Sequence, residues 1–344
     1  MDMVKKKKPK ADKNDDVTDI WDNRYDQGGS AVTEIGNVGD PIDYTSHPFI
    51  WKESIAKTLT GDFDGDPNLE LGKRIFRTPA KNMLAIGSGL AGVEEWYIIC
   101  GFVENCLAYE ASQVAVDKAN ARIKENNLSD KLKVVCGDVL KAGIKDETYD
   151  VVFVQAAIHH FFEIEEMYQF MHRVLKPGGL LIFDEYVGPD HLLLDDFTLD
   201  LMDEIDSCLS EKYKFDSPHN EFRNGVRRPT LQQMLEMDPS EGVHASDILP
   251  LTYQYFDIVE RLDYGGTILR PFFTGILNNF DFDKEGDKTI IRLIVLLEKI
   301  LTRHSIIQHS NTRIVAKKRQ KPRKPLTSKQ KERIAYEDWS GLTT

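Results

Sequence analysis

Three glycines in a short apolar stretch are the first residues whose spacing suggests binding chemistry. Residues 83–96 read MLAIGSGLAGVEEW, in which Gly87, Gly89 and Gly92 form the pattern G-x-G-x-x-G. A glycine turn between a strand and a helix lets the backbone pass close under a ligand and directs free helix N–H groups toward it. A dinucleotide or another adenosine-bearing cofactor can use such a turn, so the turn alone leaves both open.

Two histidines and a carboxylate follow later apolar segments and are candidates for catalysis. His159 and His160 come directly after VVFVQAAI, and Glu185 follows LLIFD. An alkyl hydroxyl is too weakly acidic to attack unaided, so transfer to oxygen needs a general base or a metal. The histidines could serve as that base, or they could cap the following helix or pack against its aromatic residues. Glu185 could orient a polyol acceptor or hold a divalent ion, or it could simply belong to a polar loop over the pocket. Convergence of ligands cannot be read from one sequence, so we predict no metal site.

These residues have to be positioned by strands that end at one edge of a sheet. From residue 81 onward, near-continuous apolar runs alternate with helical stretches, which predicts an α/β fold with a doubly wound, mostly parallel sheet covered on both faces. Ligands bind at the carboxyl edge of such sheets, where the glycine turn and His159 both fall. The expected strands are 82–86, 105–109, 131–136, 151–156, 180–184, 255–262 and 312–316, and the expected helices are 93–100, 112–126 and 163–175.

Five stretches, in order and spacing, resemble the class I S-adenosylmethionine-dependent methyltransferases. They are LAIGSGLAG, LAYEAS, VVCGDV, YDVVFVQAAIHHF and RVLKPGGLLIFDEYVGP. The resemblance implies a Rossmann-like sheet of seven strands with an antiparallel C-terminal strand, and S-adenosyl-L-methionine as the cofactor. Residues 190–250 are rich in acidic and helical segments, which predicts an inserted helical lid. The motifs EYVGP, RRP, DPSE and YGGT, also in order, are similar to a bacterial branch of that superfamily acting on small molecules or saccharides.

The resemblance also implies which residues hold the cofactor. The glycine turn would form its floor, and the ends of the second, third and fourth strands would hold the ribose, the adenine and the methionine part. The leader TDIWDNRYDQGG would fold over the cofactor, with its arginine on the cofactor carboxylate. The predicted cofactor residues are Gly87, Ser88, Gly89, Glu110, Ala111, Asp138, Val139, Gln155, Ala156, Arg24 and Tyr25.

One position departs from the family pattern. Ala85 stands where the family usually carries an acidic residue before its first glycine pair, which leaves the methionine amino group with one partner fewer. Glu94, one helical turn further on, either replaces that acid or is simply a favourable charge at a helix start. For Asp138 and Glu110 the structural alternatives are a turn residue and a solvated strand end.

The chain is expected to divide into six segments. The central one is the cofactor-binding core, and the others are terminal tails, a leader, a lid and a C-terminal strand pair. They are 1–16, a disordered basic and acidic tail; 17–80, a helical leader packing on the cofactor cleft; 81–189, the Rossmann-like core; 190–254, a helical lid and acceptor region; 255–316, a strand pair with inserted helices; and 317–344, a basic disordered tail.

Charge, apolar runs and cysteines limit the partners. The net charge is −12, and Lys and Arg are concentrated in residues 1–16 and 317–333, so the acidic body is not expected to bind nucleic acid. The basic C-terminal segment could contact an anionic partner, or be a solvated tail. No apolar run reaches the roughly 18 residues of a membrane span. The four cysteines lack C-x-x-C spacing, which favours free thiols and a cytoplasmic location.

We therefore predict an S-adenosylmethionine-dependent methyltransferase that acts on a small-molecule or saccharide-type acceptor, at oxygen. Two alternatives stay open. The literal glycine pattern suits a nicotinamide-dependent, NAD(P)-type reductase, although no Tyr-x-x-x-Lys pair follows the fourth strand. The basic termini and Ala85 suit a non-catalytic module that binds a cofactor or associates with RNA.

Overall fold

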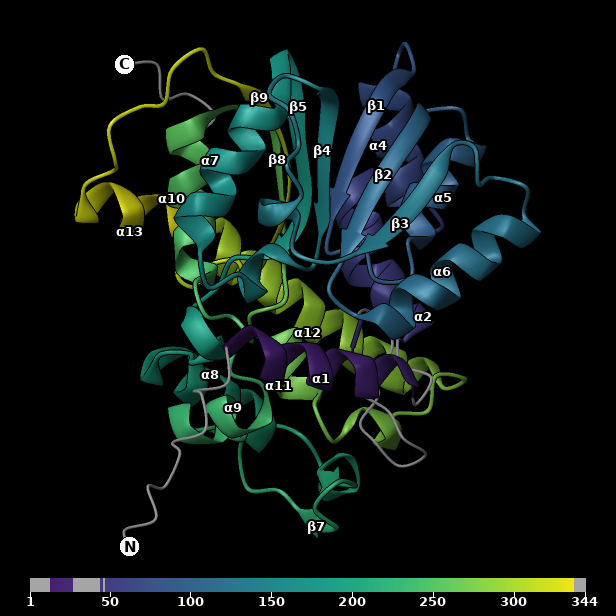
Figure 1. Ribbon diagram of the computed structural model, residues 1–344. Helices are drawn as coiled ribbons and strands as arrows, with labels where there is room; N and C mark the ends of the chain where they lie inside the picture. The colour runs from purple at the N-terminus through teal and green to yellow at the C-terminus, as the bar shows by residue number, and fades with distance from the viewer. Residues whose placement is uncertain (1–12, 27–43, 46, 337–344) are drawn as a thin grey trace, which may run out of the picture.

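The computed structural model describes residues 13–26, 44–45 and 47–336. Its centre is a seven-stranded sheet in the order β3-β2-β1-β4-β5-β9-β8, in which β9 runs antiparallel to both of its neighbours (Figure 1). This confirms the predicted Rossmann-like, mostly parallel sheet with an antiparallel C-terminal strand. The strands are β1 (Ala80–Ile86), β2 (Val103–Glu110), β3 (Leu132–Cys136), β4 (Tyr149–Gln155), β5 (Leu175–Tyr186), β8 (Phe256–Gly265) and β9 (Asn311–Lys318).

Helices cover both faces of the sheet because its central strands are apolar on both sides. Val151 and Phe153 of β4 face one core and Val152 and Val154 the other, and each is at most 3% exposed. One face packs on α7 (Ile164–Val174), α10 (Ala245–Tyr255) and α13 (Ser328–Tyr336). The other face packs on α4 (Pro67–Ile75), α5 (Gly92–Ile99) and α6 (Gln113–Glu125).

A third core joins helices that lie far apart in the sequence. It contains α2 (Pro48–Ile50), the π-helical turn Trp51–Ala56 and α3 (Lys57–Thr60), together with α8 (Asp196–Ser207), α11 (Leu269–Phe273) and α12 (Glu285–Arg303). In Figure 1 these helices lie below the sheet, next to α9 (Leu231–Met237) and the short hairpin of β6 (Phe215–Asp216) and β7 (Glu221–Phe222). Helix α1 (Lys13–Asp26) crosses this junction (Figure 1).

The C-terminal segment corrects one prediction. Residues 317–336 are folded rather than a disordered tail, because β9 continues to Lys318 and α13 follows. Ile334 of α13 is fully buried, and its carbonyl accepts a hydrogen bond from Arg261. Basic side chains of the segment find carboxylates on the acidic body, including Asp257. Residues 1–12 and 337–344, parts of the two predicted tails, lie outside the described residues.

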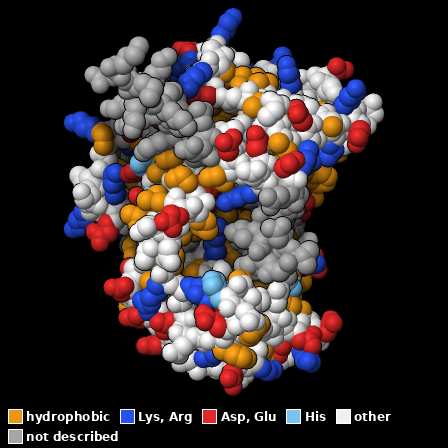
Figure 2. Space-filling model, turned by 60° about the horizontal axis from the view of Figure 1, so that its bottom comes forward, with side chains coloured by type: hydrophobic (Ala, Val, Ile, Leu, Met, Phe, Trp, Pro, Cys, Tyr) orange, Lys and Arg blue, Asp and Glu red, His pale blue; other side chains and the backbone are white. Residues whose placement is uncertain are grey.

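Two further expectations concern membranes and thiols. Within the described ranges, every helix is too short or too polar to cross a membrane. All four cysteines are free, with Cys106 buried and Cys208 exposed. The described surface shown in Figure 2 carries Lys/Arg and Asp/Glu side chains interspersed with one another.

Candidate active site

The glycine turn after β1 is compatible only with glycine at two positions. Gly87 and Gly89 have φ values of +65° and +53°, which L side chains rarely adopt. A Cβ at Gly87 would lie 2.4 Å from the Cβ of Ala157, and one at Gly89 would lie 2.6 Å from the hydroxyl of Tyr25. The Ser88 hydroxyl between them is buried without a hydrogen-bond partner among the described residues. Such an unpaired group is costly unless a ligand completes it.

A cavity opens from this turn along the carboxyl edge of the sheet. Its walls come from the ends of β1, β2 and β4, from the loop after β3, from the start of α7 and from α1. Among the predicted residues it is lined by Tyr25, Gly87, Glu110, Ala111, Asp138, Val139, Ala156 and His160. The predicted residues outside this lining are Arg24, Ser88, Gly89, Gln155, His159 and Glu185.

Glu110 connects the glycine turn to the next helix. Its carboxylate accepts hydrogen bonds from the backbone N–H of Gly89 at 2.8 Å and of Ser112 at 3.0 Å. Burial raises its pKa, although these N–H donors oppose the shift. Each carboxylate oxygen has a second lone pair, so Glu110 can still accept from a ligand hydroxyl in the cavity.

The adenine-side residues combine a structural role with a place in the cavity. Asp138 accepts from the N–H of Leu140 at 2.9 Å and thereby caps the 3-10 turn Val139–Lys141. Both Asp138 and Val139 line the cavity. At the end of β4, Ala156 has a φ of +50° and turns the backbone toward the cavity, whereas Gln155 stays in the strand opposite Asp184.

Helix α1 forms one wall of the cavity through Trp21 and Tyr25. Asp22 anchors the helix by accepting from the Ser112 hydroxyl at 2.5 Å and from the N–H of Val114 at 3.3 Å. Arg24 lies over the Trp21 ring and pairs with Asp238 at 3.6 Å. The structure therefore brings Arg24 to the DPSE motif, next to the cavity.

His159 and Glu185 form a buried pair beside the cavity. The Nδ1 of His159 lies 2.6 Å from one carboxylate oxygen of Glu185, and the other oxygen accepts from the N–H groups of Ala157 and Ile158, both at 2.6 Å. Burial alone would lower the pKa of His159, but the Glu185 carboxylate outweighs it and the pKa is raised. The fixed carboxylate leaves the Nε2 atom of the imidazole for chemistry.

His160 has a second, separate set of partners. Its Nδ1 lies 3.0 Å from the hydroxyl of Ser240, which itself donates to Asp238 at 2.7 Å. Its Nε2 lies 3.9 Å from Glu241, and Trp21 packs edge-on against its ring. Burial, followed by the neighbouring His159, lowers the pKa of His160 to about 3.

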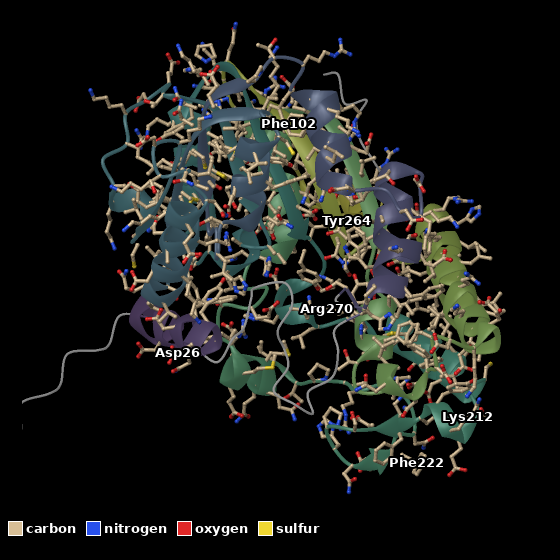
Figure 3. The ribbon with its side chains drawn as sticks, turned by 90° about the vertical axis from the view of Figure 1, so that its right-hand side faces the viewer. Asp26, Phe102, Lys212, Phe222, Tyr264 and Arg270 are labelled. Carbon is tan, nitrogen blue, oxygen red and sulfur yellow. The ribbon has the colours of Figure 1, made fainter. Side chains whose placement is uncertain are left out.

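Glu241 joins the two histidines. One carboxylate oxygen lies 3.8 Å from the Nε2 of His159 and has no hydrogen-bond partner among the described residues. Burial would raise the pKa of Glu241, but the histidines, Arg270 and Arg24 outweigh it and lower the pKa to about 2. Figure 3 shows Arg270 between the sheet and the lower helices. Asp238, Ser240, Glu241 and Arg270 were not predicted. The DPSE motif was the sequence signal for the first three, and Arg270 lies shortly after the YGGT motif.

The chain matches a known domain family over its central part. Residues 84–183 match the family described as a methyltransferase domain. The match confirms the predicted class I methyltransferase core with its S-adenosylmethionine cofactor, and favours it over the reductase alternative.

Curated relatives are similar over short stretches. A sterol 24-C-methyltransferase of Gibberella zeae is 29% identical over 143 residues, 40% of this chain and 37% of that protein. One from Saccharomyces cerevisiae is 33% identical over 86 residues, 25% of this chain and 22% of that protein. The chain thus spans well under half the length of these relatives. Among solved structures, a geranyl diphosphate C-methyltransferase from Streptomyces coelicolor is 11% identical with a TM-score of 0.47, covering 91% of this chain and 100% of that one.

Proposed function

We propose, for a chain whose residues 84–183 form a class I methyltransferase domain, that it transfers a methyl group to a hydroxyl oxygen of a polar, saccharide-type small molecule. The observation that carries this is the cluster beside the cleft, in which His159 and Glu185 are buried and His160 and Glu241 are mostly buried. The free cysteines suit a reducing cytoplasm as its location.

The cleft suits an adenosine-bearing amino acid cofactor. The buried Ser88 hydroxyl has no hydrogen-bond partner among the described residues, so a ligand can supply one. Gly87 and Gly89 leave space that any side chain would fill. Gly87 and Ser88 would lie under the cofactor, Glu110 would accept from its ribose hydroxyls, and Asp138 would accept from its adenine amino group. S-adenosylmethionine supplies an electrophilic methyl group when bound.

The chain's own residues have to remove one proton from the acceptor hydroxyl. Methylation at a hydroxyl forms a C–O bond as a S–C bond breaks, and the hydroxyl proton must leave. The polar cluster at His159 and Glu241 lies at the edge of the sheet where the acceptor would enter, and its groups can receive that proton or lower the pKa of the hydroxyl. Glu185 keeps the His159 ring oriented by holding its Nδ1.

Carbon methylation is the second candidate, because the curated relatives are named for it. The charges around the cluster support a polar acceptor instead. Arg24, Asp238 and Glu241 are all at least two-thirds buried next to His160. An apolar acceptor seated there would desolvate these groups without replacing their hydrogen bonds, which is costly.

A thermal-shift panel followed by turnover tests the proposal. S-adenosylhomocysteine should raise the melting temperature, because a ligand at about 100 times its Kd stabilises by about 2.7 kcal/mol, whereas NADH and a short RNA should not. Methyl transfer from labelled S-adenosylmethionine is then measured on polyhydroxylated acceptors and on sterols. A thermal shift with NADH alone would contradict the cofactor assignment. Turnover of sterols alone would contradict the polar acceptor and favour methylation at carbon.

A further inference from the structure

His159, His160 and Glu241 bring three ligand-type atoms together. One such atom from each residue lies within 4.8 Å of the other two. The Nε2 atoms of the histidines lie 3.8 Å and 3.9 Å from the two carboxylate oxygens of Glu241. Two ligand atoms bound to one ion at about 2.1 Å each are at most about 4.2 Å apart, so only a small inward movement is needed.

The hydrogen bonds of His160 determine its tautomer, and therefore whether the nitrogen that faces Glu241 carries a proton or a lone pair. The Ser240 hydroxyl has one proton, and it donates that proton to Asp238. Ser240 can therefore only accept from His160, which places the imidazole proton on Nδ1. The Nε2 lone pair then points toward the Glu241 carboxylate, and two electron-rich atoms face each other unless a cation lies between them.

His159 is held in the same manner. Its Nδ1 pairs with Glu185, whose other oxygen is fixed by two backbone N–H groups, so Nε2 again faces Glu241. Histidines that bind metals almost always donate their other ring N–H to a carboxylate or another acceptor, which orients the ring. Both histidines have such an outer partner, and one oxygen of Glu241 has none among the described residues.

We infer that His159, His160 and Glu241 bind a divalent transition metal ion of the zinc type. Two imidazoles and one carboxylate suit such ions, whereas Mg²⁺ and Ca²⁺ prefer oxygen ligands. The local charge agrees: the carboxylates of Glu185, Asp238 and Glu241 outnumber the guanidinium groups of Arg24 and Arg270 around the cluster. This excess of one negative charge favours a bound cation.

The site deepens the proposed function and rests on it for its chemical role. His160 lines the cofactor cavity, so a metal bound there lies at the edge of the cleft. Three protein ligands leave a coordination position for an acceptor hydroxyl, whose pKa the ion would lower.

Metal content of the untagged full-length protein tests the inference directly. We expect about one Zn²⁺ per chain by elemental analysis, loss of it to a chelator, and visible d–d absorption when Co²⁺ is added back. Glu241→Gln and His160→Gln should lower bound metal at least 10-fold, and Glu185→Gln should weaken affinity about 10-fold through the ring orientation of His159. The matched controls His304→Gln and Glu236→Gln, both exposed, should keep full occupancy.

The outcomes separate the metal from the methyl transfer. If the wild-type protein takes up neither Zn²⁺ nor Co²⁺ with a ligand-field spectrum, or if the cluster variants bind as much as the controls, the inference is overturned. That measurement on the wild type needs no variant to fold. If the protein binds S-adenosylhomocysteine but no metal, only the metal inference is contradicted. If it binds metal but transfers no methyl group, only the proposed function is contradicted.

Discussion

Glu110 is the residue on which cofactor affinity should depend most. Its carboxylate accepts from Gly89 and Ser112 and faces the cavity. Glu110→Gln replaces one acceptor oxygen by an NH₂ group that would face a backbone N–H or the ligand hydroxyls. We expect the Kd for S-adenosylhomocysteine, measured by calorimetry, to rise at least 10-fold, since hydrogen bonds to charged groups contribute about 1.5–3 kcal/mol.

Glu104→Gln is the matched control for that change, because Glu104 lies exposed on the same strand. It should leave the Kd unchanged. Equal affinities of the two variants would show that Glu110 serves the turn and not the ligand.

Glu94 should make the stability of the protein depend on pH. It is 4% exposed, and burial raises its pKa to about 7. The unfolded chain loses this proton near pH 4.5 and the folded chain near pH 7, so the free energy of unfolding falls as the pH rises through that interval. Glu94→Gln should therefore stabilise the protein by up to about 3 kcal/mol above pH 7 and hardly at all near pH 4.5.

Chemical denaturation at a series of pH values measures this difference. The exposed Glu104→Gln should show no such trend. A constant difference between Glu94→Gln and the wild type across the interval would mean that the folded protein does not hold a proton on Glu94. Burial also shows that Glu94 is more than an exposed charge at the start of α5, although it does not line the cavity.

Helix α1 should control how long the cofactor stays bound. Asp22 attaches it to the start of α6, while Trp21 and Tyr25 line the cavity. Asp22→Ala removes both attachments, worth about 1 kcal/mol each, so dissociation of S-adenosylhomocysteine in stopped-flow experiments should accelerate several-fold. Asp19→Ala, at an exposed position on the same helix, should not change it. The same rate in both variants would contradict a closing role for α1.

The core elements could be predicted from the sequence because their own residues determine them. Seven apolar runs predicted the strands to within about five residues, and the expected helices 112–126 and 163–175 correspond to α6 and α7. The helix α13 was missed because it is short and basic, and its place depends on one buried side chain, Ile334, and on carboxylates of distant segments.

The candidate site could be predicted only in part for a related reason. The glycine turn, Glu110 and Asp138 follow strands directly, so strand order places them at one edge. Ser240 and Glu241 reach the histidines across about 80 residues of chain, and neither periodicity nor spacing encodes that contact. The motif DPSE indicated that these residues matter without indicating where they lie.

At the scale of the whole molecule, charge should prevent RNA binding. The chain carries −12 overall, and cations of the C-terminal segment already pair with the body: Arg319 and Arg323 with Asp257, and Lys331 with Asp247. Phosphate contacts require free cations and weaken steeply with salt.

In fluorescence anisotropy with labelled single-stranded RNA at physiological salt, we expect no saturable binding by the wild type. The double variant Asp247→Asn/Asp257→Asn frees these cations and should gain weak affinity that disappears as salt is added. Salt-dependent binding of equal strength in both proteins would instead mean that the segment binds RNA while folded against the acidic body.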